Sequence, residues 1–208
     1  MPRPAGVRNH DFEEKREALI NSLCDFALST DLQRPALRRF ARAADASEPT
    51  LRHYFGDRQG LVLAILECVG QRLQAVRASA VKEVGEGSAI DVQLAGSLSS
   101  LRERAEIRAH AFGLIEGLAD PVVGQAYLEH ILEPTLAAIE TGLTDEIAPQ
   151  RRPRPVLRAA SLAALAPLMF MVLHQDLLGG KPRWTFDEAH ALSQIGAGIS
   201  AGLGVQPG

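Results

Sequence analysis

Arginine side chains gather in one short part of the chain, residues 34–58. This segment has six arginines and three acidic residues, a local net charge of +3, whereas the whole chain of 208 residues has a net charge of −3. It also contains Thr50, His53 and Tyr54. Arginine donates hydrogen bonds to phosphates and to the edge of guanine, and threonine can contact the methyl group of thymine. The segment is therefore a candidate surface for binding DNA.

The remainder of the chain is acidic. Residues 61–208 carry 12 basic and 16 acidic groups. A basic segment on an acidic body can bind a polyanion locally while the whole protein stays in solution. On charge alone, the solvated face of an ordinary helical hairpin explains the arginines as well, and both interpretations stay open at this point.

Residues that could catalyse a reaction or bind a metal do not have the required spacing. Metal sites in helical bundles use Glu-x-x-His pairs, and zinc proteases use His-Glu-x-x-His. Neither pattern occurs, and Glu129 and His130 are adjacent rather than three positions apart. We therefore expect no catalytic residue, no metal and no cofactor, and we predict that the chain is not an enzyme.

The chain has two cysteines, Cys24 and Cys68, far apart in the sequence. A structural zinc site needs about four ligands, and a disulfide scaffold needs a denser set of cysteines. Both residues lie among apolar residues with helical spacing, which favours buried structural thiols. A redox switch is the alternative.

Apolar residues recur at helical spacing along the chain, and no segment has the alternation of a strand. The sequence thus predicts an all-α protein with about nine helices. The expected helices are residues 11–29, 35–44, 47–54, 58–84, 88–100, 102–118, 121–143 (kinked near Pro134), 156–178 and 185–203. The longest apolar run, residues 159–173, is shorter than the roughly 18 residues of a membrane span. We interpret it as a buried helix, and because the N-terminus lacks an apolar signal core, a cytoplasmic protein is expected.

Residues 36–55 have the pattern of two short helices joined by a tight turn, a helix-turn-helix. The residues predicted to face inward are Leu37, Phe40, Ala41, Leu51 and Phe55. The outward residues are Arg38, Arg39 and Arg42 in the first helix, and Glu48, Thr50, Arg52, His53 and Tyr54 in the second. Ser47 is the expected N-cap of the second helix and Pro49 lies in its first turn.

The segment Leu37–Leu61 resembles the DNA-binding domain of the TetR family of bacterial transcriptional regulators. The matching positions are Ala41 in the first short helix, Ser47 at the end of the turn, Thr50-Leu51-Arg52-His53-Tyr54-Phe55 in the recognition helix, and Asp57-Arg58 before Leu61. The motif covers about residues 12–66, and the rest of the chain is similar to the family only in its general plan. Asp45 stands where the family has glycine, and Asp can also adopt positive φ. Arg52 replaces an aromatic residue, which changes the contact expected there.

The resemblance implies roles for individual residues. Base contacts are implied for Arg38, Glu48, Pro49 and Thr50, with Arg52 joining them, and backbone contacts for His53, Tyr54 and Arg58. Ser47, at the positive end of its helix, can approach a phosphate, and Arg39 is a further candidate on the basic face. Glu48 could accept a hydrogen bond from cytosine N4 or only complement the helix dipole, and both interpretations stay open.

The resemblance also implies a domain organisation and partners. Residues 1–10 are expected to be a disordered arm, residues 11–57 the DNA-binding domain, and residues 58–208 a helical domain that binds a ligand and dimerises through its two last helices. The candidate ligand-binding residues are His110, Phe112, Ile115, Tyr127, Ile131, Met169, Phe170, Leu173 and His174. Their apolar bias favours a small apolar or aromatic effector, although the same residues suit a plain core.

The expected function is that of a homodimeric repressor released from a palindromic operator by this effector. The alternative is an architectural or non-inducible DNA-binding protein without small-molecule control.

Overall fold

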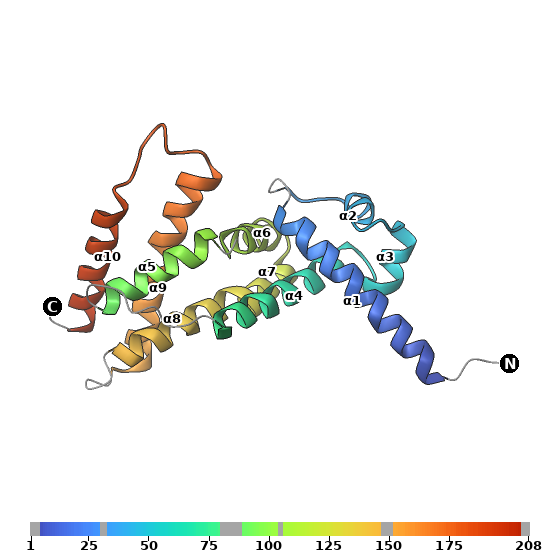
Figure 1. Cartoon of the computed structure of the whole chain (residues 1–208), viewed down its shortest axis with the longest axis horizontal. Coiled ribbons are helices and arrows are strands. Elements are labelled where there is room, and N and C mark those ends of the chain that lie inside the picture. The colour runs from blue at the N-terminus through green and yellow to red at the C-terminus, as the bar shows by residue number, and fades with distance from the viewer. Residues whose placement is uncertain (1–4, 30–32, 80–88, 104–105, 147–151, 205–208) are drawn as a thin grey trace. The chain divides into compact units, whose positions relative to one another are not determined.

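A computed structural model describes residues 5–29, 33–79, 89–103, 106–146 and 152–204, and all regular secondary structure in these ranges is helical. Two helices continue through a π-helical turn, so the described ranges hold nine continuous helices (Figure 1). The predicted fold class, an all-α protein of about nine helices, is confirmed.

The α-helical segments are α1 (Ala5–Ser29), α2 (Leu37–Ala43), α3 (Glu48–Phe55), α4 (Arg58–Ser79), α5 (Ala89–Glu103), α6 (Glu106–Ala119), α7 (Pro121–Tyr127), α8 (Glu133–Glu146), α9 (Arg154–Val172) and α10 (Glu188–Leu203). The π-helical turns are η1 (Leu128–Leu132), which joins α7 to α8, and η2 (Leu173–Leu177), which extends α9.

Helix α1 begins before its predicted start at Asp11. Residues 5–10, predicted to be part of a disordered arm, are helical, and residues 1–4 lie outside the described residues. Every residue from Ala5 to Ser29 has a backbone N–H, because Pro4 is the last proline before the helix. The helical hydrogen-bond ladder can therefore extend upstream of Asp11, so the predicted first residue lies inside the helix.

Residue contacts divide the chain into two compact units. Unit 1 consists of residues 1–78 and 108–131, and unit 2 of residues 79–107 and 132–208. Helix α4, assigned by its sequence to the second domain, groups with α1–α3. One direct link is a hydrogen bond of 3.8 Å from the thiol of Cys24 in α1 to the carbonyl oxygen of Ile65 in α4. The functional division after residue 57 stays a prediction.

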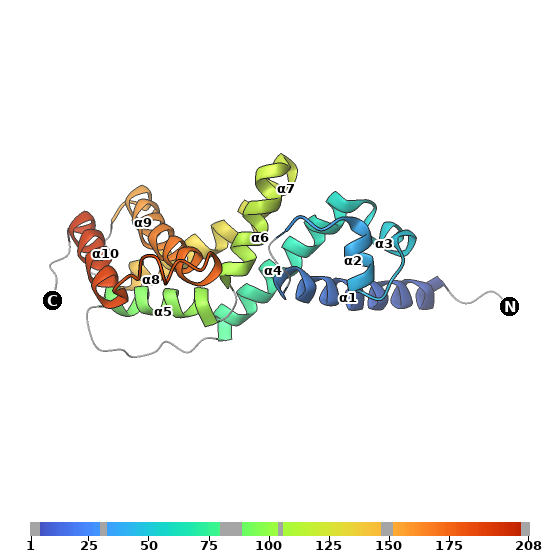
Figure 2. The same ribbon diagram turned by 90° about the horizontal axis from the view of Figure 1, so that it is seen from above.

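Helices α2 and α3 form the predicted helix-turn-helix and lie beside α1 in both views (Figure 1, Figure 2). The five residues expected to face inward are all buried. The hydroxyl of Ser47 accepts a hydrogen bond of 3.1 Å from the N–H of Thr50, so Ser47 is the N-cap of α3. Asp57 accepts one of 2.8 Å from the N–H of Gly60 at the start of α4. These local signals were sufficient to predict both helix starts.

The turn between α2 and α3 requires a left-handed backbone at Asp45. Its φ is 47°, and it is the one residue other than glycine with positive φ in the described ranges. Asp tolerates this region better than most side chains. The resemblance to a family with glycine at this position is therefore compatible with the observed turn.

The helix predicted over residues 121–143 is interrupted by η1 just before Pro134. Proline lacks the N–H that would bond to the carbonyl of His130, and its ring clashes with that carbonyl in a regular helix. A π-helical turn accommodates such a residue. Within unit 1, α4 passes close to this turn, because a Cβ atom at Gly70 would collide with the carbonyl of His130.

Unit 2 has its own core, built around α9. The core residues are Ile90, Leu94, Leu98, Leu101, Ile107, Ile139, Leu143, Leu157, Ala164, Leu165, Leu168, Val172, Ile199 and Leu203. Residues Arg154–Leu177 form a helix long and apolar enough to cross a membrane. In the most apolar 18-residue stretch of this helix, 39% is buried. Because α9 contacts α5, α8 and α10 and supplies this core, the structure favours its interpretation as a core helix.

Candidate nucleic-acid interface

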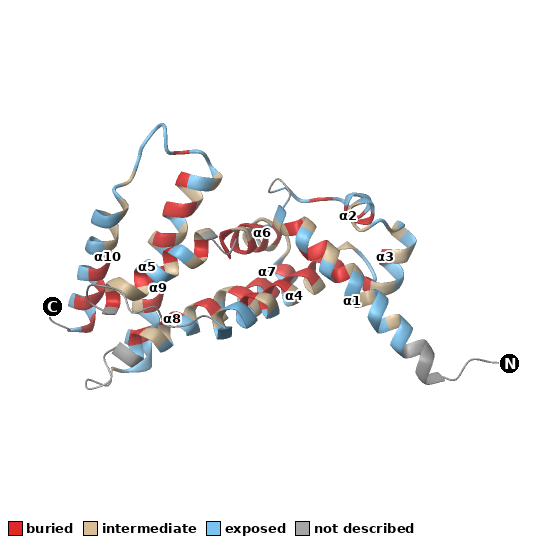
Figure 3. Ribbon diagram, viewed as in Figure 1, coloured by how far each residue is buried: buried red, intermediate tan, exposed pale blue. Residues whose placement is uncertain are grey.

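The exposed surface of α2 and α3 is basic. Arg38, Arg39, Arg42 and Arg52 are exposed, while the inner faces of both helices are buried (Figure 3). Arg39 donates a hydrogen bond of 2.9 Å to the side-chain oxygen of Gln33. The other three form no ion pair with any side chain in the described part of the chain. Within the described ranges, their guanidinium groups therefore have no acidic partner.

The N-terminus of α3 presents small polar residues. The hydroxyl groups of Ser47 and Thr50 are 2.8 Å apart, and Pro49 beside them is exposed. Glu48 is half-buried in the first turn, where a carboxylate complements the helix dipole. This position agrees with either role considered for Glu48.

An aromatic contact from α1 supports the end of α3. The ring centroid of Phe12 lies 4.7 Å from that of Tyr54 and 5.5 Å from that of His53. His53 is exposed and Tyr54 is half-buried. Packing against Phe12 restricts the orientations of both rings, so α1 orients two of the predicted backbone contacts.

Arg58 behaves differently from the arginines of α2 and α3. Its Nη2 donates to the carboxylate of Glu116 at 2.5 Å, and its Nε donates to the carbonyl oxygen of Pro35 at 2.8 Å. Arg34 reaches the other oxygen of Glu116 at 3.2 Å. The Glu116 side chain is 0% exposed, against 28% for Arg58 and 44% for Arg34. Two of the six arginines therefore balance a buried charge, and the phosphate contact expected of Arg58 competes with this internal pairing.

A second polar link lies near this ion pair in the sequence. The amide of Gln59 donates a hydrogen bond of 2.8 Å to Asp120, the N-cap of α7. This bond, together with the N–H groups of Val122 and Val123, holds the pKa of Asp120 below its usual value. Residues 58 and 59 thus both bind the segment of unit 1 formed by residues 108–131.

The nine candidate ligand-binding residues fall into the two units. In unit 1, His110 and Tyr127 are buried and form a hydrogen bond of 2.9 Å between Nδ1 and the phenol oxygen. Burial raises the pKa of Tyr127. Phe112 and Ile131 are buried, and Ile115 is half-buried. Unit 1 therefore contains a buried polar pair in apolar surroundings.

In unit 2, the candidates lie along the end of α9 and η2. Met169 and Leu173 pack against the core, whereas Phe170 is 61% exposed. The ring of Phe170 stacks on His174 at a centroid distance of 6.2 Å, and Trp184 and Phe186 also contact His174. Phe170 and His174 therefore belong to an aromatic cluster at the surface, rather than to the core of unit 2.

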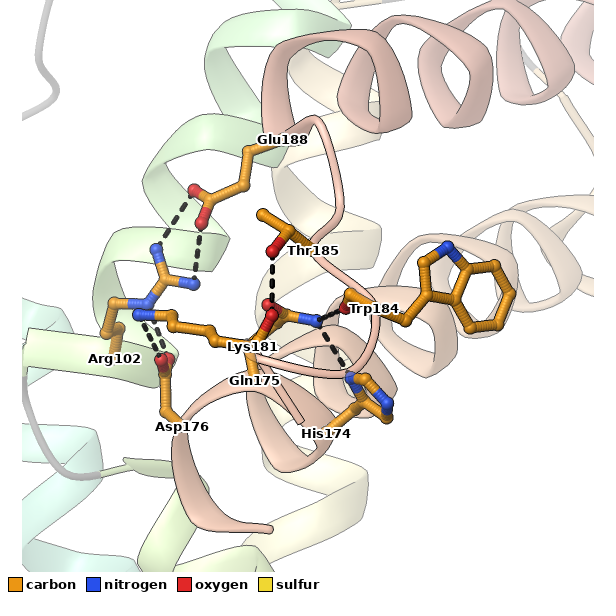
Figure 4. Close-up of polar contacts among 8 residues, drawn as sticks. All are labelled: Arg102, His174, Gln175, Asp176, Lys181, Trp184, Thr185 and Glu188. Carbon is orange, nitrogen blue, oxygen red and sulfur yellow. Dashed lines mark hydrogen bonds and ion pairs between the residues drawn. The ribbon is translucent and has the colours of Figure 1, made fainter. Parts of the chain in front are cut away.

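An ion-pair network holds the connection from η2 to α10 (Figure 4). Arg102 of α5 donates two hydrogen bonds of 3.0 Å to Glu188 and one of 2.7 Å to Asp176. The bonds to Glu188 and then to Asp176 raise the pKa of Arg102, although partial burial acts against them. Lys181 pairs with Asp176 at 3.0 Å, and the indole of Trp184 points away from this network. The network positions the connection between the two last helices.

The glycine-rich run Gly196–Gly202 has the spacing of two enzyme motifs, G-x-S-x-G and G-x-G-x-x-A. Both motifs require a turn between a strand and a helix. Here the whole run lies inside α10, and Ser200 is buried. Among the described residues, no three His, Cys, Asp or Glu side chains are grouped as metal ligands would be. Among the described residues, neither motif therefore lies at the turn between a strand and a helix that its chemistry requires.

Comparison with known proteins identifies the fold. No protein-family model and no curated protein sequence matches the chain. Solved structures do match. Salmonella enterica GusR has 17% sequence identity and a TM-score of 0.63, with 91% of this chain and 95% of that chain covered. A Rhodococcus protein described as a TetR-family transcriptional regulator has 15% identity and a TM-score of 0.62, with 91% and 99% covered. A Streptomyces coelicolor TetR-family transcriptional regulator has 16% identity and a TM-score of 0.63, with 91% and 80% covered.

The chain has the fold of the TetR-family transcriptional regulators. The resemblance first found in residues 37–61 thus extends, as a fold, over most of the chain. Within the TetR fold of this chain, α2 and α3 form the helix-turn-helix, and the basic residues on their outer faces are exposed.

For three residues near the candidate interface, the sequence pattern does not indicate the contact that each one makes. Glu116 is far from the arginines in the sequence, and a single acidic residue in an apolar helix indicates no particular partner. Phe12 and Gln33 lie outside the helix-turn-helix pattern. Each acts through a tertiary contact, which the spacing of residues cannot reveal.

For the ion pair of Arg58 and Glu116, we predict that removing either partner alone lowers the free energy of unfolding by a different amount. Arg58→Met leaves the buried Glu116 carboxylate with less compensation, and we expect the free energy of unfolding to fall by about 2 kcal/mol. Glu116→Gln should cost less, because both guanidinium groups reach solvent. The double variant should recover part of the loss, since it removes the uncompensated charge. Urea unfolding at a fixed protein concentration measures all three.

Arg52→Met is the matched control, because Arg52 is exposed and lies near Arg58 in the sequence. Its effect on stability should stay below about 0.5 kcal/mol. Equal losses for the two arginine variants, or simple additivity in the double variant, would contradict a structural role for Arg58.

Proposed function

We propose that this chain is a DNA-binding transcriptional regulator of the TetR family, with α3 as its recognition helix. One observation carries the proposal: exposed arginines of α2 and α3, without an acidic partner among the described residues, lie on a capped helix-turn-helix in a chain with the TetR fold. An α-helix fits the major groove, and arginine bonds guanine in two places. We assign base contacts to Arg38, Glu48, Pro49, Thr50 and Arg52.

Backbone contacts are proposed for Ser47, His53, Tyr54 and Arg39. Ser47 lies at the positive end of α3, and Phe12 supports the two aromatic side chains. For Arg58 we propose a mainly structural role, because its bonds to Glu116 and to the carbonyl oxygen of Pro35 fix the start of α4. A water-exposed part of its guanidinium could still approach a phosphate.

Dimerisation through α9 and α10 is part of the proposal. Helix α10 exposes Ala197, Gly198, Ala201 and Gly202 along one face, and a Cβ atom at either glycine would meet no other atom within 4 Å. Helix α9 exposes Leu162, which is 54% accessible. Small and apolar exposed residues allow a second helix to approach closely, and a twofold dimer presents two recognition helices to successive major grooves.

Control by a small apolar or aromatic effector and repression of the target genes complete the proposal. The buried pair of His110 and Tyr127 among apolar residues supports an effector site in unit 1, because such a pair can orient a largely apolar ligand. The rival function, an architectural protein without such control, shares the DNA-binding surface. We further propose that the protein acts in the cytoplasm and catalyses no reaction.

Selection of bound DNA from a random double-stranded pool, at a stated salt concentration, tests DNA recognition. We expect a palindrome whose half-sites lie about 10 base pairs apart or a multiple of this. Binding should weaken steeply as salt rises, because arginines displace counterions from phosphates. Salt-dependent binding with no preferred sequence would favour the architectural protein instead.

On the selected operator, Arg38→Ala should weaken binding by about 1–3 kcal/mol and relax the preference at one base position. Arg183→Ala is the control, since Arg183 is also exposed but lies in unit 2. If both variants bind the operator as tightly as the unaltered protein, Arg38 does not read a base.

The dimer prediction is tested with Leu162→Glu and Gly198→Glu. Each places a charge on the exposed face of α9 or α10, where burial in an interface would leave it unpaired. Sedimentation should show dissociation to monomers at concentrations at which the unaltered chain is a dimer. Ser99→Glu on the exposed side of α5 should stay dimeric. A monomeric unaltered chain would contradict the proposed assembly.

The effector prediction uses a panel of neutral aromatic compounds, screened for those that raise the melting temperature. Such a compound should change operator affinity by about 5- to 150-fold, the usual range of coupling between two sites. Tyr127→Phe should weaken the compound's effect but not operator binding in its absence. Unchanged operator affinity at saturating compound would refute control by that compound class, because an effector acts only through different affinities for two states.

A further inference from the structure

The two cysteines of the chain, distant in sequence, are neighbours in unit 1. Cys24 lies on α1 and is buried, and Cys68 lies on α4 and is half-exposed. The Cys24 thiol donates to the carbonyl oxygen of Ile65, one helical turn before Cys68. Positions three apart share a helix face, so Cys68 is on the side of α4 that faces Cys24.

The two thiols also interact directly. The Cys24 thiol donates toward the Cys68 sulfur, and this contact acts together with burial, the larger effect, to raise the pKa of Cys24. Cys24 therefore stays protonated at neutral pH. Cys68 is the more accessible of the two, and an oxidant in solution would reach it first.

An arginine clamp holds the two helices in register beside the thiols. Arg72, one turn after Cys68, bonds to Asp25 at 2.6 Å and to the side-chain oxygen of Asn21 at 2.8 Å. A third bond of 3.2 Å reaches the backbone oxygen of Asn21. These partners lie on α1 on the same stretch as Cys24. The charge of Arg72 acts on Cys24 against the larger effect of burial, but the pKa of Cys24 stays raised.

We propose that Cys24 and Cys68 form a redox-sensitive pair that closes to an intramolecular disulfide when a peroxide oxidises the protein. The disulfide would join α1 to α4, on which the helix-turn-helix is supported. This inference does not depend on DNA binding or on the proposed effector.

The reaction balances in two steps. The Cys68 sulfur attacks one peroxide oxygen, so that an S–O bond forms and the O–O bond breaks; with hydrogen peroxide, the leaving hydroxide takes up the proton of the Cys68 thiol and departs as water. The Cys24 sulfur then attacks the Cys68 sulfur of the sulfenic acid, an S–S bond forms and the S–O bond breaks, and the Cys24 proton passes to the leaving hydroxide, which departs as a second water. The two thiols supply two electrons and two hydrogens, which reduce one peroxide to two waters. Rotation of the side chains must bring the sulfurs to about 2.05 Å.

Intact mass spectrometry of the full-length chain tests the inference. Reduced protein is treated with one equivalent of hydrogen peroxide, and remaining thiols are alkylated under denaturing conditions. We expect a monomer lighter by about 2 Da, with neither cysteine alkylated, and recovery of both thiols on reduction. Digestion should release one linked pair of peptides containing Cys24 and Cys68.

Single variants separate the roles of the two thiols. In Cys24→Ala, Cys68 should accumulate as sulfenic acid, which dimedone traps. In Cys68→Ser, the buried Cys24 should stay a thiol after the same treatment. A Cys68-linked dimer, or further oxidation of Cys68 while Cys24 stays a thiol in the unaltered chain, would overturn the proposal. Because each readout is a mass, failure of DNA binding would not affect it.

Hydrogen exchange on the same samples tests the restraint on α1. Peptides within residues 11–29 should exchange several-fold more slowly after oxidation and return to their original rate after reduction. Unchanged exchange in a sample that contains the disulfide would show that the bond does not restrain α1, and would overturn that part of the inference.

Discussion

The buried carboxylate of Glu116 is the constraint on which the candidate interface depends. A charge taken out of water needs partners of opposite charge, and the cost of leaving it unpaired is large. The partners are Arg34, just before α2, and Arg58, the first residue of α4. Because Arg58 also bonds the carbonyl of Pro35, the entry to α2 and the start of α4 meet at one point. The helix-turn-helix is thus fixed at both of its ends.

The same pairing sorts six arginines of one short segment into two groups. Arg34 and Arg58 have an acidic partner inside the protein, whereas those on the outer faces of α2 and α3 have none among the described residues. An arginine that already balances a buried carboxylate loses that compensation if it turns outward, so it is poorly suited to bind a phosphate. An exposed arginine without such a partner loses only its bound water when it contacts a phosphate. The local charge of +3 therefore overstates what the surface can offer to DNA.

Most of the helices could be predicted because their signals are local. The cap at Ser47, the turn at Asp45 and the apolar spacing of α2 and α3 each act within a few residues. The outward residues of α2 and α3 follow from the same pattern, whereas the individual contacts predicted for them come from the resemblance to a known family. The grouping of α4 with α1–α3, the pairing of Arg58 and the support from Phe12 could not be predicted, because each depends on a partner far away in sequence. The earlier start of α1 was missed because weak N-terminal signals do not exclude a helix.

Helix α9 illustrates how composition alone misleads. Its length and apolar content would allow it to cross a membrane, yet Leu157, Leu165 and Leu168 pack in the core of unit 2. A helix that served only this core would need one apolar stripe, with polar residues on the opposite side. Leu162 and Phe170 instead leave apolar side chains exposed, and α10 adds a face of small residues. An exposed apolar surface of this kind is costly in water, and the proposed dimer through α9 and α10 would bury both the apolar side chains and the small residues.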